Sequence, residues 1–208
     1  MREILCFGDS NTWGYSPATG QRYPANVRWT GVLQAAVGND YHVIEEGLNG
    51  RTSVWEDPIE GDKMGKRHLP VLLQSHAPLD LVVIMLGTND LKKRFSAPAS
   101  DVAASMGVLV DIIHASACGR EGASPAVILV APPPLGRLSA FEGMFEGGSE
   151  KSHHLGKLYR EQARLRDCHF LDAGEVIRSS DLDGVHFEEN EHLALGRAIA
   201  SEVKKALH

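Results

Sequence analysis

The chain alternates between short, mostly apolar runs and longer stretches in which apolar residues recur every three or four positions. The short runs are rich in β-branched residues and predict buried strands at residues 4–7, 42–44, 81–86, 126–131 and 169–171. The periodic stretches predict helices over residues 29–37, 69–76, 102–117, 155–165 and 191–207. In the last of these helices one apolar face is expected to contain Leu193, Leu195, Ile199, Val203 and Leu207.

Strands that alternate with helices imply right-handed βαβ units and therefore a mostly parallel sheet covered on both faces. The fold class predicted from this pattern is α/β. No repeat, low-complexity tract or linker interrupts it, so residues 1–208 are expected to form a single domain. Two connections, residues 47–67 and 132–150, are long and rich in turn residues, which is typical of loops that shape a binding site or an interface.

Composition and charge narrow the function classes. The chain is 43% hydrophobic and 23% charged, which is typical of a globular protein, and its net charge of −6 argues against nucleic acid or an anionic membrane as a partner. The nearest basic run, residues 91–95, is interpreted as a solvated surface turn. The longest apolar run, residues 81–86, is too short to span a bilayer.

Cysteine use and the position of the first strand bear on location. The three cysteines, Cys6, Cys118 and Cys168, form neither a CxxC motif nor a disulfide framework. The first strand begins near residue 3 and leaves no room for a signal peptide, so a reducing cytoplasm is the expected location.

The first apolar run ends abruptly in Gly8-Asp9-Ser10. That pattern suits a strand whose carboxyl end delivers a serine hydroxyl onto a tight turn, which makes Ser10 the candidate nucleophile. A serine hydroxyl is a weak nucleophile, so it needs an imidazole base, an acid that orients the base, and donors for the oxyanion.

Asp183 and His186 supply an acid and a base three residues apart. On a turn that leads into a helix, this spacing can bring the carboxylate to the imidazole Nδ1 and leave Nε2 free to face Ser10. His192 competes as the base and Asp181 as the acid, although His192 lies within the last helix pattern and Asp181 has a different spacing.

Oxyanion donors are available from three places: the backbone N–H of Ser10, the backbone N–H of Gly50, and the side-chain amide of Asn89. These residues follow the first, second and third strands, and Asp183 and His186 follow the fifth. All of them therefore fall at the carboxyl edge of the sheet, where ligands bind in open α/β folds. If the strand order is 2-1-3-4-5, Ser10 and Asn89 flank the switch point between strands 1 and 3.

Each block has a plain structural alternative. Gly8-Asp9-Ser10 and the block 87–90 could be turns with capping side chains, and His186 could be a loop histidine. Asp9 and Asp90 are interpreted as residues that tie down loops. The blocks favour catalysis because they occur together, in this order, at the ends of the strands.

The chain resembles the SGNH hydrolases, also called the GDSL family. The resemblance rests on Gly8-Asp9-Ser10, Gly50, Gly87-Thr88-Asn89-Asp90 and Asp183-Gly184-Val185-His186, and it extends over essentially the whole chain. It implies a flavodoxin-like three-layer α/β/α sandwich with a five-stranded parallel sheet of order 2-1-3-4-5. It also implies that Ser10 is the nucleophile, His186 the base and Asp183 its orienting acid. Ser10, Gly50 and Asn89 would form the oxyanion hole, and no metal or other cofactor would be needed.

Longer stretches, such as residues 8–15, 27–33, 85–90 and 145–148, resemble the bacterial arylesterase branch, which includes acyltransferases and perhydrolases. This implies a homo-oligomeric esterase for short acyl groups, chiefly acetyl, with possible transfer of the acyl group to alcohols or peroxide. Trp13 and Phe145 are candidates for the lining of the substrate pocket, while Trp55 and Phe145 are also candidates for a subunit interface. Two alternatives remain: a carbohydrate O-acetyl esterase and a non-catalytic flavodoxin-like binding module.

Overall fold

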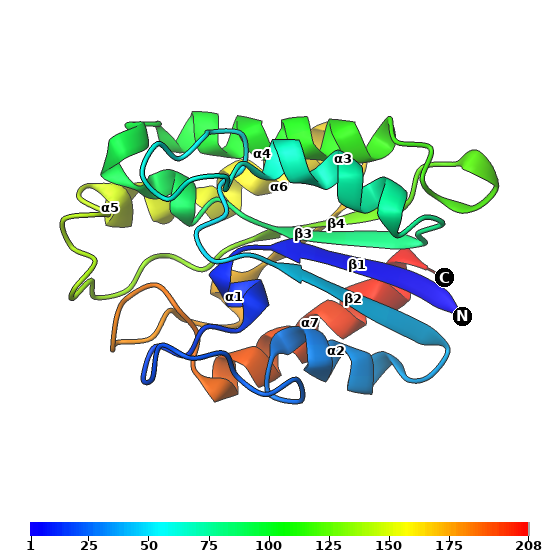
Figure 1. The fold of residues 1–208 in the computed structure, drawn as a ribbon, viewed down its shortest axis with the longest axis horizontal. Helices are drawn as coiled ribbons and strands as arrows, with labels where there is room; N and C mark the ends of the chain where they lie inside the picture. The colour runs from blue at the N-terminus through cyan, green and yellow to red at the C-terminus, as the bar shows by residue number, and fades with distance from the viewer. Residues whose placement is uncertain (208) are drawn as a thin grey trace.

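The computed structural model describes residues 1–207. Five parallel strands form one sheet of order β2-β1-β3-β4-β5, which confirms the predicted topology (Figure 1). The strands are β1 (Arg2–Gly8), β2 (Tyr41–Gly47), β3 (Leu81–Met85), β4 (Ala126–Ala131) and β5 (His169–Asp172). All four pairings are parallel, and β1 and β3 are neighbours at the centre of the sheet. Successive strands are therefore added on one side of β1 for β2 and on the other side for β3, β4 and β5. Open α/β folds bind ligands at this switch point between β1 and β3.

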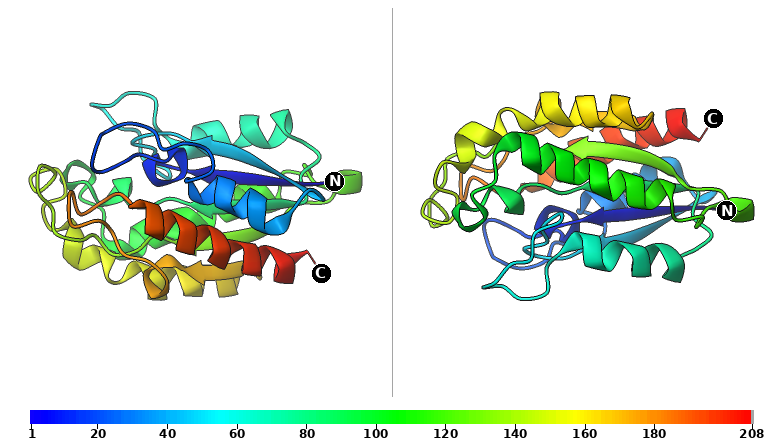
Figure 2. Two further views of the ribbon diagram at one scale, coloured as in Figure 1. Left: turned by 90° about the horizontal axis from the view of Figure 1, so that it is seen from below. Right: turned by 90° about the horizontal axis from the view of Figure 1, so that it is seen from above.

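Helices cover both faces of the sheet. The longer ones are α2 (Trp29–Val37), α3 (Gly65–Ser75), α4 (Ala99–His114), α6 (Leu155–Leu165) and α7 (Glu189–Ala206). One face carries α2 and α7, while the other carries α3, α4 and α6 (Figure 2). The result is the expected three-layer α/β/α sandwich.

The core follows the period-two alternation of the buried strands. In β1, Leu5 and Phe7 pack towards α3, α4 and α6, while Ile4 and Cys6 pack towards α2 and α7. β3 divides in the same way, and all five of its residues are buried. Because both faces of these strands are covered, their sequences read as continuous apolar runs.

Most boundaries of the predicted helices are confirmed within a few residues, but the apolar face assigned to α7 is partly wrong. Leu193 is 39% exposed, whereas the neighbouring His192 is fully buried. Leu193 lies about 200° around the helix from Leu195, so it cannot share the face that Leu195, Ile199 and Val203 form. The polar His192 occupies the core position instead.

Two short helices were not predicted: α1 (Ser10–Trp13), directly after β1, and α5 (Gly148–Ser152), at the end of the second long loop. Both lie near the carboxyl ends of the strands, while the two chain termini lie at the opposite end of the sheet (Figure 1). Across residues 1–207, no helix combines the length and the apolar character that crossing a bilayer requires.

Candidate active site

Ser10 is the first residue of α1 and follows the carboxyl end of β1 by two positions. Asp9 caps this short helix, since its side chain accepts a hydrogen bond from the Asn11 N–H at 3.0 Å. The turn is tight: a Cβ atom at Gly8 would overlap with Thr12 and with the carbonyl oxygen of Met85. The local sequence therefore fixes where the Ser10 hydroxyl emerges from the sheet.

The Ser10 hydroxyl, the His186 imidazole and the Asp183 carboxylate form a chain of two contacts. His186 Nε2 lies 3.0 Å from Ser10 Oγ, and His186 Nδ1 lies 2.7 Å from Asp183 Oδ2. This is the geometry that an imidazole needs to take a proton from a serine while a carboxylate holds its tautomer. The structure thus brings Ser10, His186 and Asp183 together, as the sequence predicts.

The Asp183 carboxylate is locked by its own loop. Its Oδ1 accepts hydrogen bonds from the backbone N–H groups of Val185 and His186, each at 2.9 Å. Gly184, which links Asp183 to Val185, adopts φ +77°. Burial alone would raise the pKa of Asp183, but the hydrogen bonds from the His186 ring and from these two N–H groups outweigh it and lower the pKa below its ordinary value. Asp183 therefore stays ionised beside the imidazole.

The three expected oxyanion donors converge beside Ser10. Within residues 1–207 the backbone N–H groups of Ser10 and Gly50 make no hydrogen bond, and Gly50 has φ +80°, a conformation that favours glycine. Asn89 Nδ2 donates one hydrogen to Asp9 Oδ2 at 3.3 Å. Its second hydrogen remains for a ligand, and Ser10, Gly50 and Asn89 all line the same cavity.

Two buried charged residues support these donors. Asp9 holds the Asn89 amide, and burial raises the pKa of Asp9 to about 6 although the Asn11 N–H opposes the shift. The Arg51 guanidinium lies 4.2 Å from the centre of the Phe7 ring and donates to the carbonyl of Gly8 at 2.8 Å. Because Arg51 follows Gly50, this bond ties the second oxyanion donor to the turn that carries Ser10.

Asp90 ties the first long loop to the end of β3, as its sequence position suggests. Its Oδ1 accepts the Ser53 N–H at 2.8 Å and the Ser53 hydroxyl at 2.5 Å. Burial raises the pKa of Asp90 to about 6, although these two bonds oppose the shift. Asp90 does not line the cavity that contains Ser10, so we assign it to holding the loop in position rather than to catalysis.

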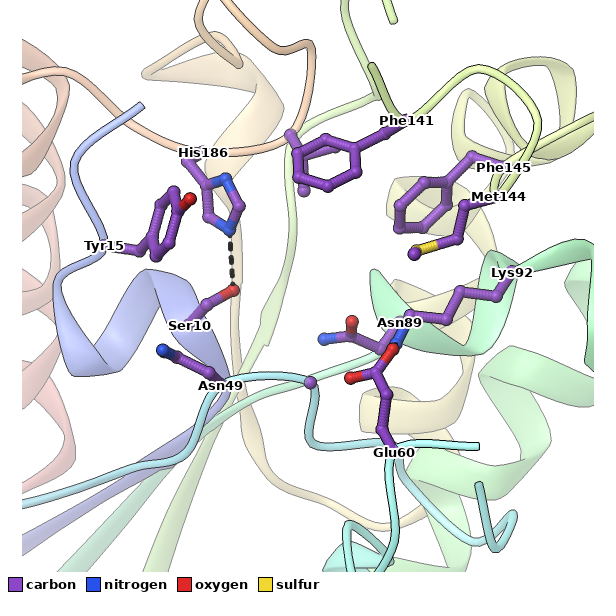
Figure 3. Close-up of a pocket in the computed structure, with 12 residues that line it drawn as sticks. Ser10, Tyr15, Asn49, Glu60, Asn89, Lys92, Phe141, Met144, Phe145 and His186 are labelled. Carbon is purple, nitrogen blue, oxygen red and sulfur yellow. Dashed lines mark hydrogen bonds and ion pairs between the residues drawn. The ribbon is translucent and has the colours of Figure 1, made fainter. Parts of the chain in front are cut away.

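A cavity of about 150 Å³ opens beside Ser10 and His186 (Figure 3). One side is apolar, and Figure 3 shows Phe141, Met144 and Phe145 there. Another side is polar, where Glu60 and Lys92 meet below them in the same view. A cavity of this size can hold a group as large as benzene but no long chain.

The cavity lining differs from the sequence-based expectation in one place. Phe145 contributes, but Trp13 does not: its backbone packs against Gly47 and its ring lies 5.2 Å from the Arg22 guanidinium. Tyr15, two residues further on, faces the cavity instead, and its ring centre lies 4.1 Å from that of His186. The tight turn of α1 carries Trp13 away from the site, whereas Gly14, with φ +92°, returns the chain towards it.

The interpretation of residues 91–95 as a solvated turn is wrong for Lys92. Its side chain is only 2% exposed, and its Nζ lies 2.5 Å from Glu60 Oε1 and 3.5 Å from Asp57 Oδ2. Lys93, by contrast, is exposed. The two acidic partners of Lys92 come from the loop between β2 and α3, about thirty residues earlier, so local composition could not reveal the burial.

His192, the competing base, lies away from Ser10. It is fully buried between α2 and α7, where its Nδ1 accepts the Trp29 N–H at 3.2 Å. Burial, assisted by the positive charge of Arg28, lowers the pKa of His192 to about 4 from an ordinary value of 6.5. His192 is therefore a neutral core residue at neutral pH.

This pKa predicts a pH-dependent stability. The unfolded chain binds a proton at His192 below pH 6.5, whereas the folded chain does so only below about pH 4, so stability is lost as pH falls between these values. We expect the destabilisation caused by His192→Gln, measured by urea unfolding, to be about 2 kcal/mol smaller at pH 4.5 than at pH 7. The exposed His154→Gln is the control, and a pH-independent effect of His192→Gln would contradict this assignment.

Within residues 1–207, no group of three or more His, Cys, Asp or Glu side chains is arranged to hold a metal ion. His153 and His154 lie at the start of α6, outside the cavity that contains Ser10.

Comparison with known proteins extends these observations. Residues 6–192 match the model of the GDSL-like lipase/acylhydrolase family. Est24, a carbohydrate acetylesterase from Sinorhizobium meliloti, is 44% identical over 99% of both chains with a TM-score of 0.95. The aryl esterase of M. smegmatis is 43% identical over 100% of both chains, also with a TM-score of 0.95.

A more distant structure shares the fold. The lipase/acylhydrolase from Enterococcus faecalis is 23% identical, with a TM-score of 0.70 over 99% of this chain and 96% of that one. No curated protein sequence gave a significant match.

Proposed function

The chain belongs to the GDSL-like lipase/acylhydrolase family and is a carboxylic ester hydrolase, and from this premise we propose that it cleaves short-chain esters, chiefly acetyl esters, through an acyl-enzyme on Ser10. The observation that carries the proposal is the contact of Ser10 with His186 and of His186 with Asp183 at the mouth of a small cavity.

The geometry supports a two-step reaction. Ser10 Oγ attacks the ester carbonyl while His186 Nε2 takes its proton, and the carbonyl oxygen becomes an oxyanion that Ser10 N–H, Gly50 N–H and Asn89 Nδ2 stabilise. The alcohol leaves with the proton from His186 Nε2, and the acyl group stays on Ser10. Water, deprotonated by His186, then attacks the acyl carbon, and Ser10 recovers its proton as the acid departs. An alcohol in place of water gives transesterification.

The names of the two similar structures point to two alcohol classes. One is described as a carbohydrate acetylesterase and the other as an aryl esterase. We propose that this chain selects its substrates by an acetyl-sized acyl group, in esters of either alcohol class.

The cavity volume predicts a preference among acyl groups. We expect kcat/KM for p-nitrophenyl esters to fall by at least about tenfold from acetate to octanoate, because a chain longer than the cavity must displace packed side chains. A series of p-nitrophenyl esters from two to eight acyl carbons measures this. Met144→Ala, which widens the apolar side, should raise the octanoate rate relative to acetate. Equal rates across the series would contradict a small acyl site.

A further inference from the structure

Glu60 and Lys92 form a charged pair in the wall of the cavity that contains Ser10. Glu60 lies in the loop between β2 and α3, and Lys92 lies three residues after Asn89. Lys92 Nζ donates to Glu60 Oε1 at 2.5 Å, and both side chains contribute to the cavity (Figure 3). The catalytic steps described above do not use either residue.

Two further residues hold this pair in place. Asp57 Oδ2 lies 3.5 Å from Lys92 Nζ, and Asp57 Oδ1 accepts a hydrogen bond from Arg94 Nη1 at 2.9 Å. Asp57 Oδ1 also accepts the Glu60 N–H at 3.0 Å, so the loop is fixed next to the cation that Glu60 binds. Lys92 is buried and the Glu60 side chain is 29% exposed. An ion pair of this kind contributes little net stability compared with apolar packing, so its presence in a cavity wall calls for another explanation.

The Glu60 carboxylate also packs against the oxyanion hole. A Cβ atom at position 50 would overlap with Glu60 Oε2, so the carboxylate occupies space that a glycine leaves free. Within residues 1–207, Oε2 accepts no hydrogen bond, while Oε1 accepts that of Lys92. The cavity therefore presents one unused anionic acceptor beside Gly50.

The chemistry of the reaction decides which half of the ester meets this pair. The leaving oxygen must lie next to His186 Nε2 to receive its proton, and the carbonyl oxygen must point at Gly50 and Asn89. Glu60 packs against Gly50. Figure 3 shows Glu60 and Lys92 beside Asn89, across the cavity from His186. The acyl half, not the alcohol half, is thus directed towards the charged pair.

We propose that the Glu60–Lys92 pair selects the acyl group: it rejects apolar extensions beyond acetyl and accepts a short acyl group that ends in a hydroxyl. An alkyl chain placed against the pair removes water from the Glu60 carboxylate, whose side chain is 29% exposed, and returns no hydrogen bond. A hydroxyl at the same position donates to Glu60 Oε2 and replaces the lost water. This inference rests on the ester hydrolysis at Ser10 proposed above and specifies which acyl groups that site takes.

The test compares phenyl hydroxyacetate with phenyl propionate, which share their leaving group and differ by a hydroxyl in place of a methyl group. In the double variant Glu60→Leu/Lys92→Leu, we expect the ratio of kcat/KM for hydroxyacetate over propionate to fall at least about tenfold below the wild-type ratio. The comparison between proteins cancels the different intrinsic reactivities of the two esters. Asp57 keeps Arg94 as its partner in this variant, so no buried charge is left unpaired.

Two single variants complete the experiment. Glu60→Gln keeps the shape of the side chain and should shift the ratio in the same direction by a smaller factor, which preserves the test if the double variant does not fold. Glu56→Gln removes an exposed charge from the same loop and should leave the ratio unchanged.

The outcomes separate the two proposals. An unchanged ratio in Glu60→Gln and in the folded double variant overturns the selection of the acyl group, even if phenyl acetate is hydrolysed. No Ser10-dependent hydrolysis of phenyl acetate by the wild type overturns the proposed function, and the inference falls with it.

Discussion

Replacing Ser10 with alanine is expected to lower kcat for p-nitrophenyl acetate by at least about 10³-fold. The Ser10 hydroxyl contacts His186 Nε2 and lies in the cavity that Gly50 and Asn89 also line, so its loss removes the proposed acyl-enzyme pathway. The proposed oxyanion donors and the cavity remain, so the variant should still hydrolyse the ester faster than the uncatalysed reaction in water. Release of p-nitrophenolate by equal amounts of folded wild type and variant measures the effect.

Ser100→Ala is a suitable control, since Ser100 is exposed near the start of α4 and does not contact the cavity. Circular dichroism and thermal unfolding should match for the three proteins. Equal rates for wild type and Ser10→Ala would mean that the site has the family geometry without its chemistry. The alternative of a non-catalytic binding module would then be favoured.

The segments that place the catalytic groups could be predicted because each follows a strand of the parallel sheet. Parallel strands bring their carboxyl ends to one edge of the sheet. The residues that follow β1, β2, β3 and β5 are therefore expected to converge at that edge. Ser10, Gly50, Asn89 and His186 were located in this way, and the structure brings all four to one cavity.

The remaining wall of the cavity could not be predicted, because its residues come from loops without periodicity. Glu60 and Phe141 lie in the two long connections, whose paths depend on contacts with distant segments. The burial of Lys92 depends on Asp57 and Glu60 in the same way. A pattern of local polarity describes a residue and its neighbours in sequence, whereas an ion pair across a cavity involves the tertiary fold.

The error in α7 has a different origin. Apolar periodicity identifies a helix reliably. It shows which face of the helix is buried only where the buried positions are themselves apolar. His192 occupies a core position because its Nδ1 accepts the Trp29 N–H, which no apolar side chain could do. A polar residue with a specific buried partner therefore escaped the pattern, and Leu193 was assigned to the face in its place.

Asp183→Asn is the second substitution with a large expected effect, a loss of about 10⁴-fold in kcat for p-nitrophenyl acetate near neutral pH. Asparagine can keep its side-chain oxygen on the N–H groups of Val185 and His186, so the loop should hold its shape. The atom that faces His186 Nδ1 then becomes an amide NH₂, a donor where the carboxylate was an acceptor. The imidazole must then adopt the tautomer that has its proton on Nε2, and that nitrogen can no longer take the proton of Ser10.

Asp181→Asn is the matched control, because Asp181 is an exposed acid in the same loop, two residues away, and was the competing candidate for the orienting role. We expect it to retain nearly the wild-type rate. A large loss of rate in Asp181→Asn together with a small loss in Asp183→Asn would show that Asp181, not Asp183, orients His186. If Asp183→Asn alone is slow and its circular dichroism and thermal unfolding match those of the wild type, the defect is one of tautomer rather than of structure.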